Sequence, residues 1–150
     1  MLLVASMIPV KIHAMPGSRI PEYQSQGASG ADVCALLNDP ITLKPGDTAL
    51  ISTGLSIELP EGYEAQIRPR SGLAISHGIT LLNTPGTIDS DYRGEIKIIV
   101  TNLGKNDFTI TSGMRIAQMI FSKIYRGQFI VSDELSQTSR NSGGFGHSGV

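Results

Sequence analysis

Asp89 is the side chain in this sequence best placed to activate a water molecule. It follows Ile88 in the stretch LNTPGTIDSDYRGEI (residues 82–96), and we expect its carboxylate to point inward with little solvent around it. A carboxylate held in that way can act as a general base on water. The turn at Pro85–Gly86 predicts a β-hairpin that brings Asn83 near Asp89. A solvated acidic turn is the alternative interpretation of the same residues.

A pair of arginines stands immediately before a short predicted helix. Arg68 and Arg70 lie in the stretch RPRSGLA, and the helical pattern runs from about Ser71 to Gly78. Ser71 is a candidate N-cap, because its hydroxyl can accept a hydrogen bond from a free N–H group of the first turn. The same N–H groups beside an arginine form a candidate anion site. The stretch leaves the cap and the anion site as equal alternatives.

Two further stretches place polar side chains in a glycine-rich or apolar context. In GASGADVCA, Asp32 follows a glycine-rich turn, where turn chemistry alone favours Asp and Gly. In GMRIAQMIF, Arg115 and Gln118 interrupt a hydrophobic strand, so both side chains need polar partners. A structural role for those partners is the plainer interpretation.

Metal ligands of the zinc type are not grouped in this sequence. His13, His77 and His147 are far apart and Cys34 is the single cysteine, so the spacing does not indicate a zinc site. A hard cation such as Mg²⁺ is compatible with the sequence, because it needs only one or two protein carboxylates when substrate phosphates supply other ligands.

The chain ends in RNSGGFGHSGV, which sets an arginine and a phenylalanine among four glycines. Glycine loses more backbone entropy on ordering than any other residue, so a terminal segment of this composition is expected to fray. Arg140 and Phe145 allow two interpretations: a tail without function, or a segment that orders when it covers a ligand.

The composition is that of an ordinary globular domain. The chain has 150 residues, of which 40% are hydrophobic and 17% charged, and its formal net charge is −1. One domain is the simplest organisation, and the lack of a basic field argues against nucleic-acid binding. No stretch reaches membrane-spanning length, and the single cysteine favours a reducing compartment, so a cytoplasmic protein is expected. Residues 1–7 are interpreted as an extension that leads into the first strand.

Short alternating runs between Gly and Pro residues predict the elements that must position these side chains. Hairpins are expected between residues 55–59 and 63–67, within 41–51, and within 106–121. Residues 95–102 (EIKIIVTN) carry apolar side chains on both faces, which indicates a central strand or one covered by another subunit. Many short strands and one short helix predict an all-β sandwich or barrel.

Five of these stretches occur in one order across almost the whole chain: GASGADVCA, PRSGLA, GTIDSDYRGEI, GMRIAQMIF and RNSGGFGHSG. Together they closely resemble the motifs of the trimeric dUTPases, the deoxyuridine triphosphate nucleotidohydrolases. The resemblance implies a β jelly roll over residues 1–139, followed by a flexible glycine-rich lid over residues 140–150. It also implies a homotrimer with three active sites at subunit junctions, and Mg²⁺-dependent hydrolysis of dUTP to dUMP and pyrophosphate. That reaction would limit uracil in DNA and supply dUMP for dTMP synthesis.

The resemblance implies roles for the residues at the nucleoside end of the substrate. Asp89 resembles the residue that orients and deprotonates the water attacking the α-phosphorus. Tyr92 resembles the ring beneath the deoxyribose, which leaves no room for a 2′-hydroxyl. Asn83 matches a position that reads the uracil edge in some bacterial members. Backbone groups of three residues would supply the rest of that readout: Gly86, Thr87 and Ile88.

At the phosphate end, the resemblance implies that Arg70, Ser71 and Gly72 contact the triphosphate, with the Ser71 hydroxyl near the leaving oxygen. Gln118 matches a further phosphate contact, and Asp32 resembles the carboxylate that holds Mg²⁺ through water. Ser71 and Gln118 therefore join the general base in the implied catalytic set.

The tail would act as the lid in this family. Arg140 would hold the γ-phosphate, and Phe145 would stack on uracil with Gly146 beside it. Family tails usually have glycine directly after the arginine, whereas this chain has Asn141. Because asparagine tolerates left-handed backbone better than most residues, we expect a small effect on lid closure.

Two rival functions fit the residues less well. The dCTP deaminase branch of the same fold needs a further acid/base set near the base, and this chain has Ile99 and Ile75 where deaminases usually carry a glutamate and an arginine. A non-enzymatic jelly-roll trimer that binds dUTP or a protein partner would not need Asp89 and Ser71 together.

Overall fold

The computed structural model describes residues 7–146, so residues 1–6 of the predicted N-terminal extension lie outside it. Nearly all of its regular structure is β-strand, as expected. The described part of the chain has one helix, α1 (Ser71–His77). Its strands are β1 (Lys11–Ala14), β2 (Glu22–Tyr23), β3 (Ala31–Cys34), β4 (Ile41–Leu43), β5 (Thr48–Glu58), β6 (Tyr63–Arg68), β7 (Ile79–Leu81), β8 (Gly86–Ile88), β9 (Ile96–Asn102), β10 (Phe108–Ile110) and β11 (Arg115–Lys123).

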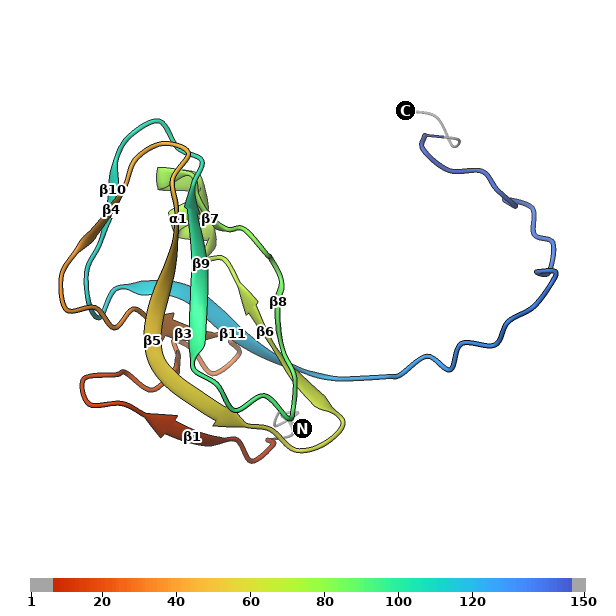
Figure 1. The fold of residues 1–150 in the computed structure, drawn as a ribbon, viewed down its shortest axis with the longest axis horizontal. Coiled ribbons are helices and arrows are strands. Elements are labelled where there is room, and N and C mark those ends of the chain that lie inside the picture. The colour runs from red at the N-terminus through yellow and green to blue at the C-terminus, as the bar shows by residue number, and fades with distance from the viewer. Residues whose placement is uncertain (1–6, 147–150) are drawn as a thin grey trace.

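The strands form two sheets that enclose one core (Figure 1). Sheet A has the strand order β1-β5-β9-β7, sheet B has the order β2-β3-β11-β6-β8, and β10 and β4 form a separate short pair. Buried side chains from both sheets contact one another in the core: Ile51 and Ile98 from sheet A, and Val33, Ile67 and Met119 from sheet B. β9 pairs with both β5 and β7, so the prediction of a central strand is confirmed. The predicted jelly-roll class is likewise confirmed.

The predicted turns are present, but the predicted hairpins are wrong. β5 pairs with β1 and β9, whereas β6 pairs with β8 and β11, so the turn at residues 60–62 connects the two sheets. β4 and β10 pair with each other, so the turns at 45–46 and 112–113 close no hairpin either. β7 belongs to sheet A and β8 to sheet B, which rules out the hairpin expected around residues 83–89. Alternation fixes which face of a strand is buried, but it does not fix the partner strand.

The helix α1 begins and ends close to the predicted positions. Its N-cap is Arg70, and no side chain caps it, so the interpretation of Ser71 as the N-cap is wrong. Ser71 is instead the first helical residue, because the carbonyl of Arg70 already accepts the N–H of Ala74 at 3.1 Å. At the other end Gly78 has a φ of 68°, and a Cβ there would lie 2.6 Å from Cα of Gly104, so this position requires glycine.

The C-terminal segment leaves the folded body after β11. Residues 124–146 form no helix or strand, and they project away from the two sheets (Figure 1). Six large apolar side chains of this segment are at least 80% exposed: Tyr125, Phe129, Ile130, Val131, Leu135 and Phe145. The division of the chain into a domain and a lid at residue 140 stays a prediction. No helix among the described residues is long and apolar enough to cross a membrane.

Candidate active site

Polar side chains from distant parts of the sequence meet on the outer face of sheet B. Strand register places Gln118 of β11 between Asp32 of β3 and Arg68 of β6. Arg70 follows β6, and Arg115 is the first residue of β11, so both arginines reach the same place. We call Asp32, Arg70, Arg115 and Gln118 the arginine cluster.

The carboxylate of Asp32 is held between two guanidinium groups. Its Oδ1 lies 3.1 Å from Nε of Arg70, and its Oδ2 lies 3.0 Å from Nη1 of Arg115. Arg70 also donates a hydrogen bond from Nη1 to the carbonyl of Arg115 at 3.0 Å. Because only 11% of the Asp32 side chain is exposed, these pairs are screened less than surface ion pairs. The cluster carries the positive charges of two arginines and the negative charge of one aspartate, so its net positive charge favours the binding of an anion.

Gln118 is fixed by the backbone around it. Its Nε2 donates to the carbonyl of Pro69 at 3.0 Å, which provides the polar partner that its place in a hydrophobic strand requires. Its side chain lies against Gly30, where an added Cβ would meet Oε1 of Gln118 and lie 3.1 Å from its Cδ. The glycine-rich turn before Asp32 therefore leaves the space that Gln118 occupies.

The arginine cluster fits Mg²⁺ through water. Asp32 supplies its only carboxylate, and no three His, Cys, Asp or Glu side chains are grouped for a metal within residues 7–146. Each Asp32 oxygen already accepts from one arginine, but a carboxylate has about four acceptor positions, so others remain for water. Mg²⁺ keeps several waters and takes further ligands from substrate phosphates. This donor set is consistent with the predicted water-mediated role of Asp32.

A pocket of about 490 Å³ is lined by most of the residues that were predicted to contact the nucleoside. We call it the β8 pocket. Thr87, Ile88, Asp89 and Tyr92 all line it. The hydroxyl of Tyr92 donates to a backbone carbonyl at 3.0 Å, and the side chain remains 44% exposed, so the ring is available to a ligand. The remaining lining residues come from β5, from β9 and from the residue before β9: Leu50, Glu95, Ile96, Lys97 and Ile99.

β8 is an edge strand of sheet B, since β6 is its only neighbour in the described sheet. An edge strand directs the N–H and C=O groups of every second residue away from its partner. Residues Gly86–Ile88 therefore present free backbone donors and acceptors. Asn83 lies close to the same segment, because its Nδ2 is 3.4 Å from the place where a Cβ of Gly86 would be.

Several predicted site residues face solvent in the single chain, among them Asp89, Ser71 and Gly72. Asp89 is exposed, so the expectation of an inward carboxylate with little solvent is wrong for one chain. The reason is that Asp89 follows an edge strand and not a covered hairpin. Ser71 and Gly72 are also exposed, and apart from its chain neighbours and the backbone of its own helix no described atom lies within 4 Å of a Cβ placed on Gly72. This open space lies at the start of α1, beside Arg70.

The arginine cluster and Asp89 lie at opposite ends of β6. The cluster is level with Arg68, the β6 partner of Gln118. Ile88 pairs with Ala65, so Asp89 lies level with Glu64. The two levels are about 13 Å apart, because a strand rises about 3.3 Å per residue. In one chain, Asp89 and the arginine cluster are therefore two separate groups of residues along β6.

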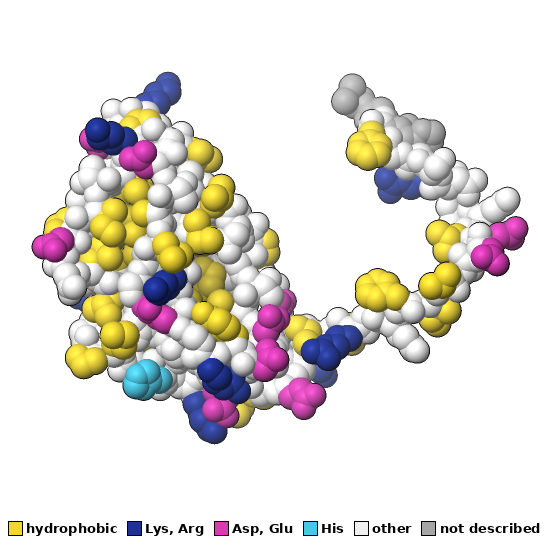
Figure 2. Space-filling view, viewed as in Figure 1, with side chains coloured by type: hydrophobic (Ala, Val, Ile, Leu, Met, Phe, Trp, Pro, Cys, Tyr) yellow, Lys and Arg dark blue, Asp and Glu magenta, His cyan; other side chains and the backbone are white. Residues whose placement is uncertain are grey.

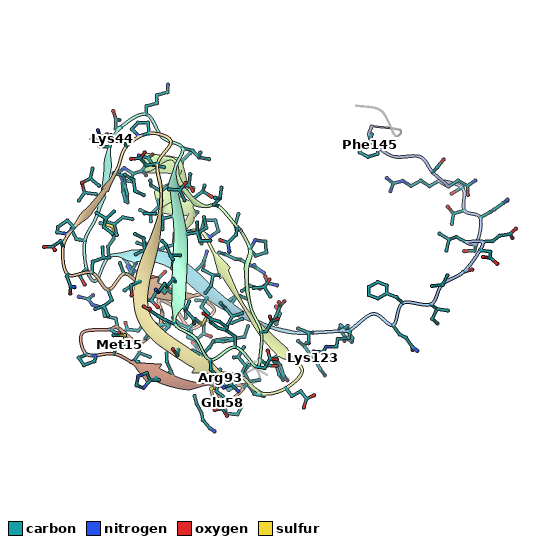
Figure 3. The ribbon with its side chains drawn as sticks, viewed as in Figure 1. Met15, Lys44, Glu58, Arg93, Lys123 and Phe145 are labelled. Atoms are coloured by element: carbon teal, nitrogen blue, oxygen red, sulfur yellow. The ribbon has the colours of Figure 1, made fainter. Side chains whose placement is uncertain are left out.

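The predicted lid residues lie on the C-terminal segment. Figure 3 shows Phe145 far from Lys123, where β11 ends, and its side chain is fully exposed. Asn141 has a φ of 43°, the left-handed backbone that asparagine tolerates. Nε of Arg140 donates locally to the carbonyl of Gly143 at 2.7 Å. Closure of the lid stays a prediction, and its last four residues, 147–150, lie outside the described residues.

Two titratable groups beside these regions have shifted pKa values. Burial raises the pKa of the Cys34 thiol, so the thiol is protonated at neutral pH and is a poor nucleophile. The hydrogen bond from Ser52 lowers the pKa of Glu95, and a bond from the backbone of Gly54 acts in the same direction. The stability that Glu95 contributes is therefore present above its unfolded-state pKa and is lost as the pH falls through its lower folded-state pKa.

Comparison with known proteins places these regions in a family. The family model described as dUTPase matches residues 17–149, which include the arginine cluster, the β8 pocket and the described lid residues. The chain belongs to the dUTPase family. A deoxyuridine 5′-triphosphate nucleotidohydrolase from Caldanaerobacter subterraneus subsp. tengcongensis is 59% identical over 131 residues, which cover 87% of this chain and 88% of that relative.

Solved structures of phage dUTPases share the fold. A Staphylococcus bacteriophage 80alpha dUTPase with dUPNHPP superposes with a TM-score of 0.86 at 23% identity, covering 95% of this chain and 99% of that one. A mutant dUTPase from phage phi11 of S. aureus, described as revealing the coordination of a structural Mg(II) ion, superposes with a TM-score of 0.77 at 19% identity. That match covers 86% of this chain and 99% of the phage chain.

Two side chains of this dUTPase-family chain were not assigned from its sequence. Arg115 pairs with Asp32, and its only signal was a charge at the start of a hydrophobic strand. Glu95 lines the β8 pocket and bonds to β5. No local pattern indicated that role, because its partners lie more than 40 positions earlier in the chain.

Proposed function

We propose that the chain hydrolyses dUTP to dUMP and pyrophosphate by attack of water on the α-phosphorus. The observation that carries the proposal is the β8 pocket, where Thr87, Ile88, Asp89 and Tyr92 line one space. A bond forms from the water oxygen to the α-phosphorus, and the bond from that phosphorus to its bridging oxygen breaks. The water proton passes to a base, and pyrophosphate leaves with the electron pair. A cytoplasmic location, where DNA precursors are made, is part of the proposal.

The edge of β8 reads the base. Its free N–H and C=O groups can pair with uracil as an added strand would pair, because backbone groups at a sheet edge are unsatisfied. Cytosine carries an amino donor where uracil carries an acceptor, so it would meet a backbone donor and be rejected. Asn83 contributes an amide beside the same segment. The ring of Tyr92 lies beneath the deoxyribose and excludes a 2′-hydroxyl.

Asp89 acts as the general base. A positioned carboxylate contributes about 10²–10⁴-fold to a reaction by taking a proton from the attacking water. Its exposed position in one chain allows a nucleotide and a neighbouring subunit to cover it. Burial of Asp89 by the nucleotide and the neighbouring subunit would exclude bulk solvent, as the role of a general base requires.

The arginine cluster holds the triphosphate. Attack at phosphorus depends on alignment and charge neutralisation, and Arg70 and Arg115 bring two positive charges to one partly buried carboxylate. Ser71 and Gly72 border the open space beside Arg70, where the Ser71 hydroxyl would lie near the leaving oxygen. Gln118 would add a further contact. Mg²⁺, when bound through water to Asp32 and directly to the phosphates, would neutralise charge and fix the triphosphate in one conformation.

The active form is a homotrimer in which different chains complete each site. The separation of Asp89 from the arginine cluster along β6 supports this assembly. Apolar side chains are also uncovered on the outer face of sheet A and beside it: Leu50 is 59% exposed and Leu82 is 66% exposed. Leu50 pairs with the partly exposed Ile99 on β9, and Figure 2 shows apolar side chains gathered over this face. Exposed apolar patches of this kind are typical of contact surfaces between chains.

The C-terminal segment closes over the bound nucleotide. Sixteen residues connect Lys123 to Arg140, enough to span up to about 60 Å when extended, so the tail can reach a site on its own or a neighbouring chain. Arg140 would hold the γ-phosphate and Phe145 would stack on uracil, with Gly146 giving the backbone room to turn. Both side chains are exposed and available for these contacts.

A pyrophosphate-release assay on a panel of nucleotides tests the proposed function. We expect release from dUTP and a lower kcat/KM with each of the other nucleotides. UTP and dTTP should be about 10-fold or more worse, because each adds one small group that is excluded sterically, and dCTP should be at least about 100-fold worse, because its polar groups do not match the site. Removal of divalent cations with EDTA should abolish release, and added Mg²⁺ should restore it. Tight dUTP binding without release would instead indicate a binding protein, and ammonia release from dCTP would indicate a deaminase.

A further inference from the structure

Glu95 connects the loop between β8 and β9 to strand β5. Its Oε1 accepts hydrogen bonds from the hydroxyl of Ser52 and from the N–H of Gly54, the latter at 2.9 Å. Both donors lie where the register of β5 against β9 shifts. At such an irregularity the backbone N–H has no partner in the ladder, so the carboxylate takes the place of a strand acceptor.

The part of β5 that Glu95 bonds is closely packed. Gly54 has a φ of 66°, and a Cβ there would meet Oγ of Ser18 and lie 2.5 Å from Cδ2 of Leu36. The carbonyl of Gly54 accepts hydrogen bonds from the hydroxyl of Ser18 at 3.2 Å and from the N–H of Met15 at 2.9 Å. Glu95 therefore bonds to a part of β5 that is itself fixed, both by close packing around Gly54 and by hydrogen bonds from Ser18 and Met15.

Tyr92 in turn takes its position from Glu95. Its hydroxyl donates to the carbonyl of Glu95 at 3.0 Å, and its N–H donates to the carbonyl of Asp89 at 3.1 Å. Its ring lies against Gly94, where a Cβ would be 2.6 Å from Cζ of the ring. Among the described residues, the other hydrogen bonds of loop 89–95 stay inside the loop, from Arg93 to nearby carbonyls. The carboxylate of Glu95 is therefore the side-chain link from this loop to the sheet.

We infer that Glu95 is a positioning residue that holds Tyr92 in the β8 pocket and so sets the discrimination between a deoxyribose and a ribose. The inference rests on the proposed function, in which Tyr92 lies beneath the sugar. Without the bonds to β5 the loop can shift, the ring moves away from the sugar, and a 2′-hydroxyl fits. One carboxylate oxygen makes both bonds to β5. The amide oxygen of a glutamine can make the same two bonds, whereas alanine makes neither.

The test compares Glu95→Ala with Glu95→Gln in the full-length protein. The measured quantity is the ratio of kcat/KM for dUTP to kcat/KM for UTP. We expect Glu95→Ala to lower this ratio about 10-fold or more, because steric exclusion of one small group contributes about 10–200-fold. Glu95→Gln should keep the ratio within about threefold of the wild type.

Lys11→Ala is the matched control. It removes a surface ion pair in which Nζ of Lys11 lies 2.9 Å from Oε1 of Glu58 on β5, and Lys11 does not line the β8 pocket. Its variant should keep the wild-type ratio. A role of Glu95 in stability alone would lower the melting temperature of Glu95→Ala and leave the ratio unchanged, and that result would overturn the inference.

Ser52→Ala keeps the test decisive if Glu95→Ala does not fold. It removes one of the two donors and leaves the carboxylate in place, so we expect a smaller fall in the same ratio. An unchanged ratio in a folded Ser52→Ala variant would overturn the inference. Failure of the proposed function looks different, because the wild-type protein itself would then release no pyrophosphate from dUTP.

Discussion

Asp89→Asn is expected to reduce kcat for dUTP by about 10²–10⁴-fold while leaving the Kd for the nucleotide nearly unchanged. Asparagine has the same size as aspartate and still offers an oxygen to water, but it cannot take the proton. Asp89 is exposed, so the exchange removes no packing contact and the folded state should keep its stability. The loss should therefore be confined to the chemical step.

Pyrophosphate release measures the turnover of this variant, and calorimetric titration with a non-hydrolysable dUTP analogue measures its binding. Asp91→Asn is the control, because Asp91 is exposed in the same loop and does not line the β8 pocket. It should turn over like the wild type. Wild-type turnover in Asp89→Asn would mean that the base is misassigned, and equal losses of turnover and binding would indicate a binding role instead.

Deletion of residues 140–150 is expected to lower kcat/KM for dUTP by about 10²–10⁴-fold. Stacking of an aromatic ring on a base contributes about 1–3 kcal/mol, and a hydrogen bond to a charged phosphate contributes about 1.5–3 kcal/mol. Together these terms correspond to about two to four factors of ten. The melting temperature should not change, because within residues 7–146 the Arg140 side chain bonds only inside the tail and Phe145 is fully exposed.

Single substitutions separate the two contributions of the lid. Phe145→Ala should weaken discrimination among bases, and Arg140→Ala should raise the KM for dUTP more than for an analogue that lacks the γ-phosphate. Ser142→Ala, an exposed change between them, is the control. A truncated protein that melts much earlier than the full chain would show that the tail is structural.

The sequence predicted which segments are strands, but not how they pair. The alternating residues at 55–59 and 63–67 do form β5 and β6, and the turn between them exists. Period-two alternation identifies a buried face, and both sheets bury the same kind of face in one core. A local pattern therefore cannot tell a hairpin from a connection that crosses between sheets. The central position of β9 was predictable, because apolar residues on both of its faces are a property of the strand itself.

In the candidate site, too, local sequence patterns indicated single residues but not the contacts between residues far apart in the chain. Asp32, Arg70 and Gln118 were predicted from motifs, but the ion pair of Asp32 with Arg115 joins residues 83 positions apart, and no local pattern indicates it. The exposure of Asp89 was predicted wrongly, because an apolar neighbour says nothing about a strand edge. Asn141 has the left-handed backbone that asparagine tolerates, and its effect on lid closure stays a prediction.

The central claim is that Asp89 of one chain acts on a triphosphate held by the arginine cluster of another. Co-expression of differently tagged Asp89→Asn and Arg70→Ala chains, followed by a pyrophosphate-release assay on the mixed trimers, tests it most directly. Each variant alone should be nearly inactive. In a trimer that holds both kinds of chain, one of the three interfaces joins an intact Asp89 to an intact Arg70, so about one third of the sites should regain wild-type activity. Mixed trimers no more active than the separate variants would show that each site is built within one chain, and would contradict the account.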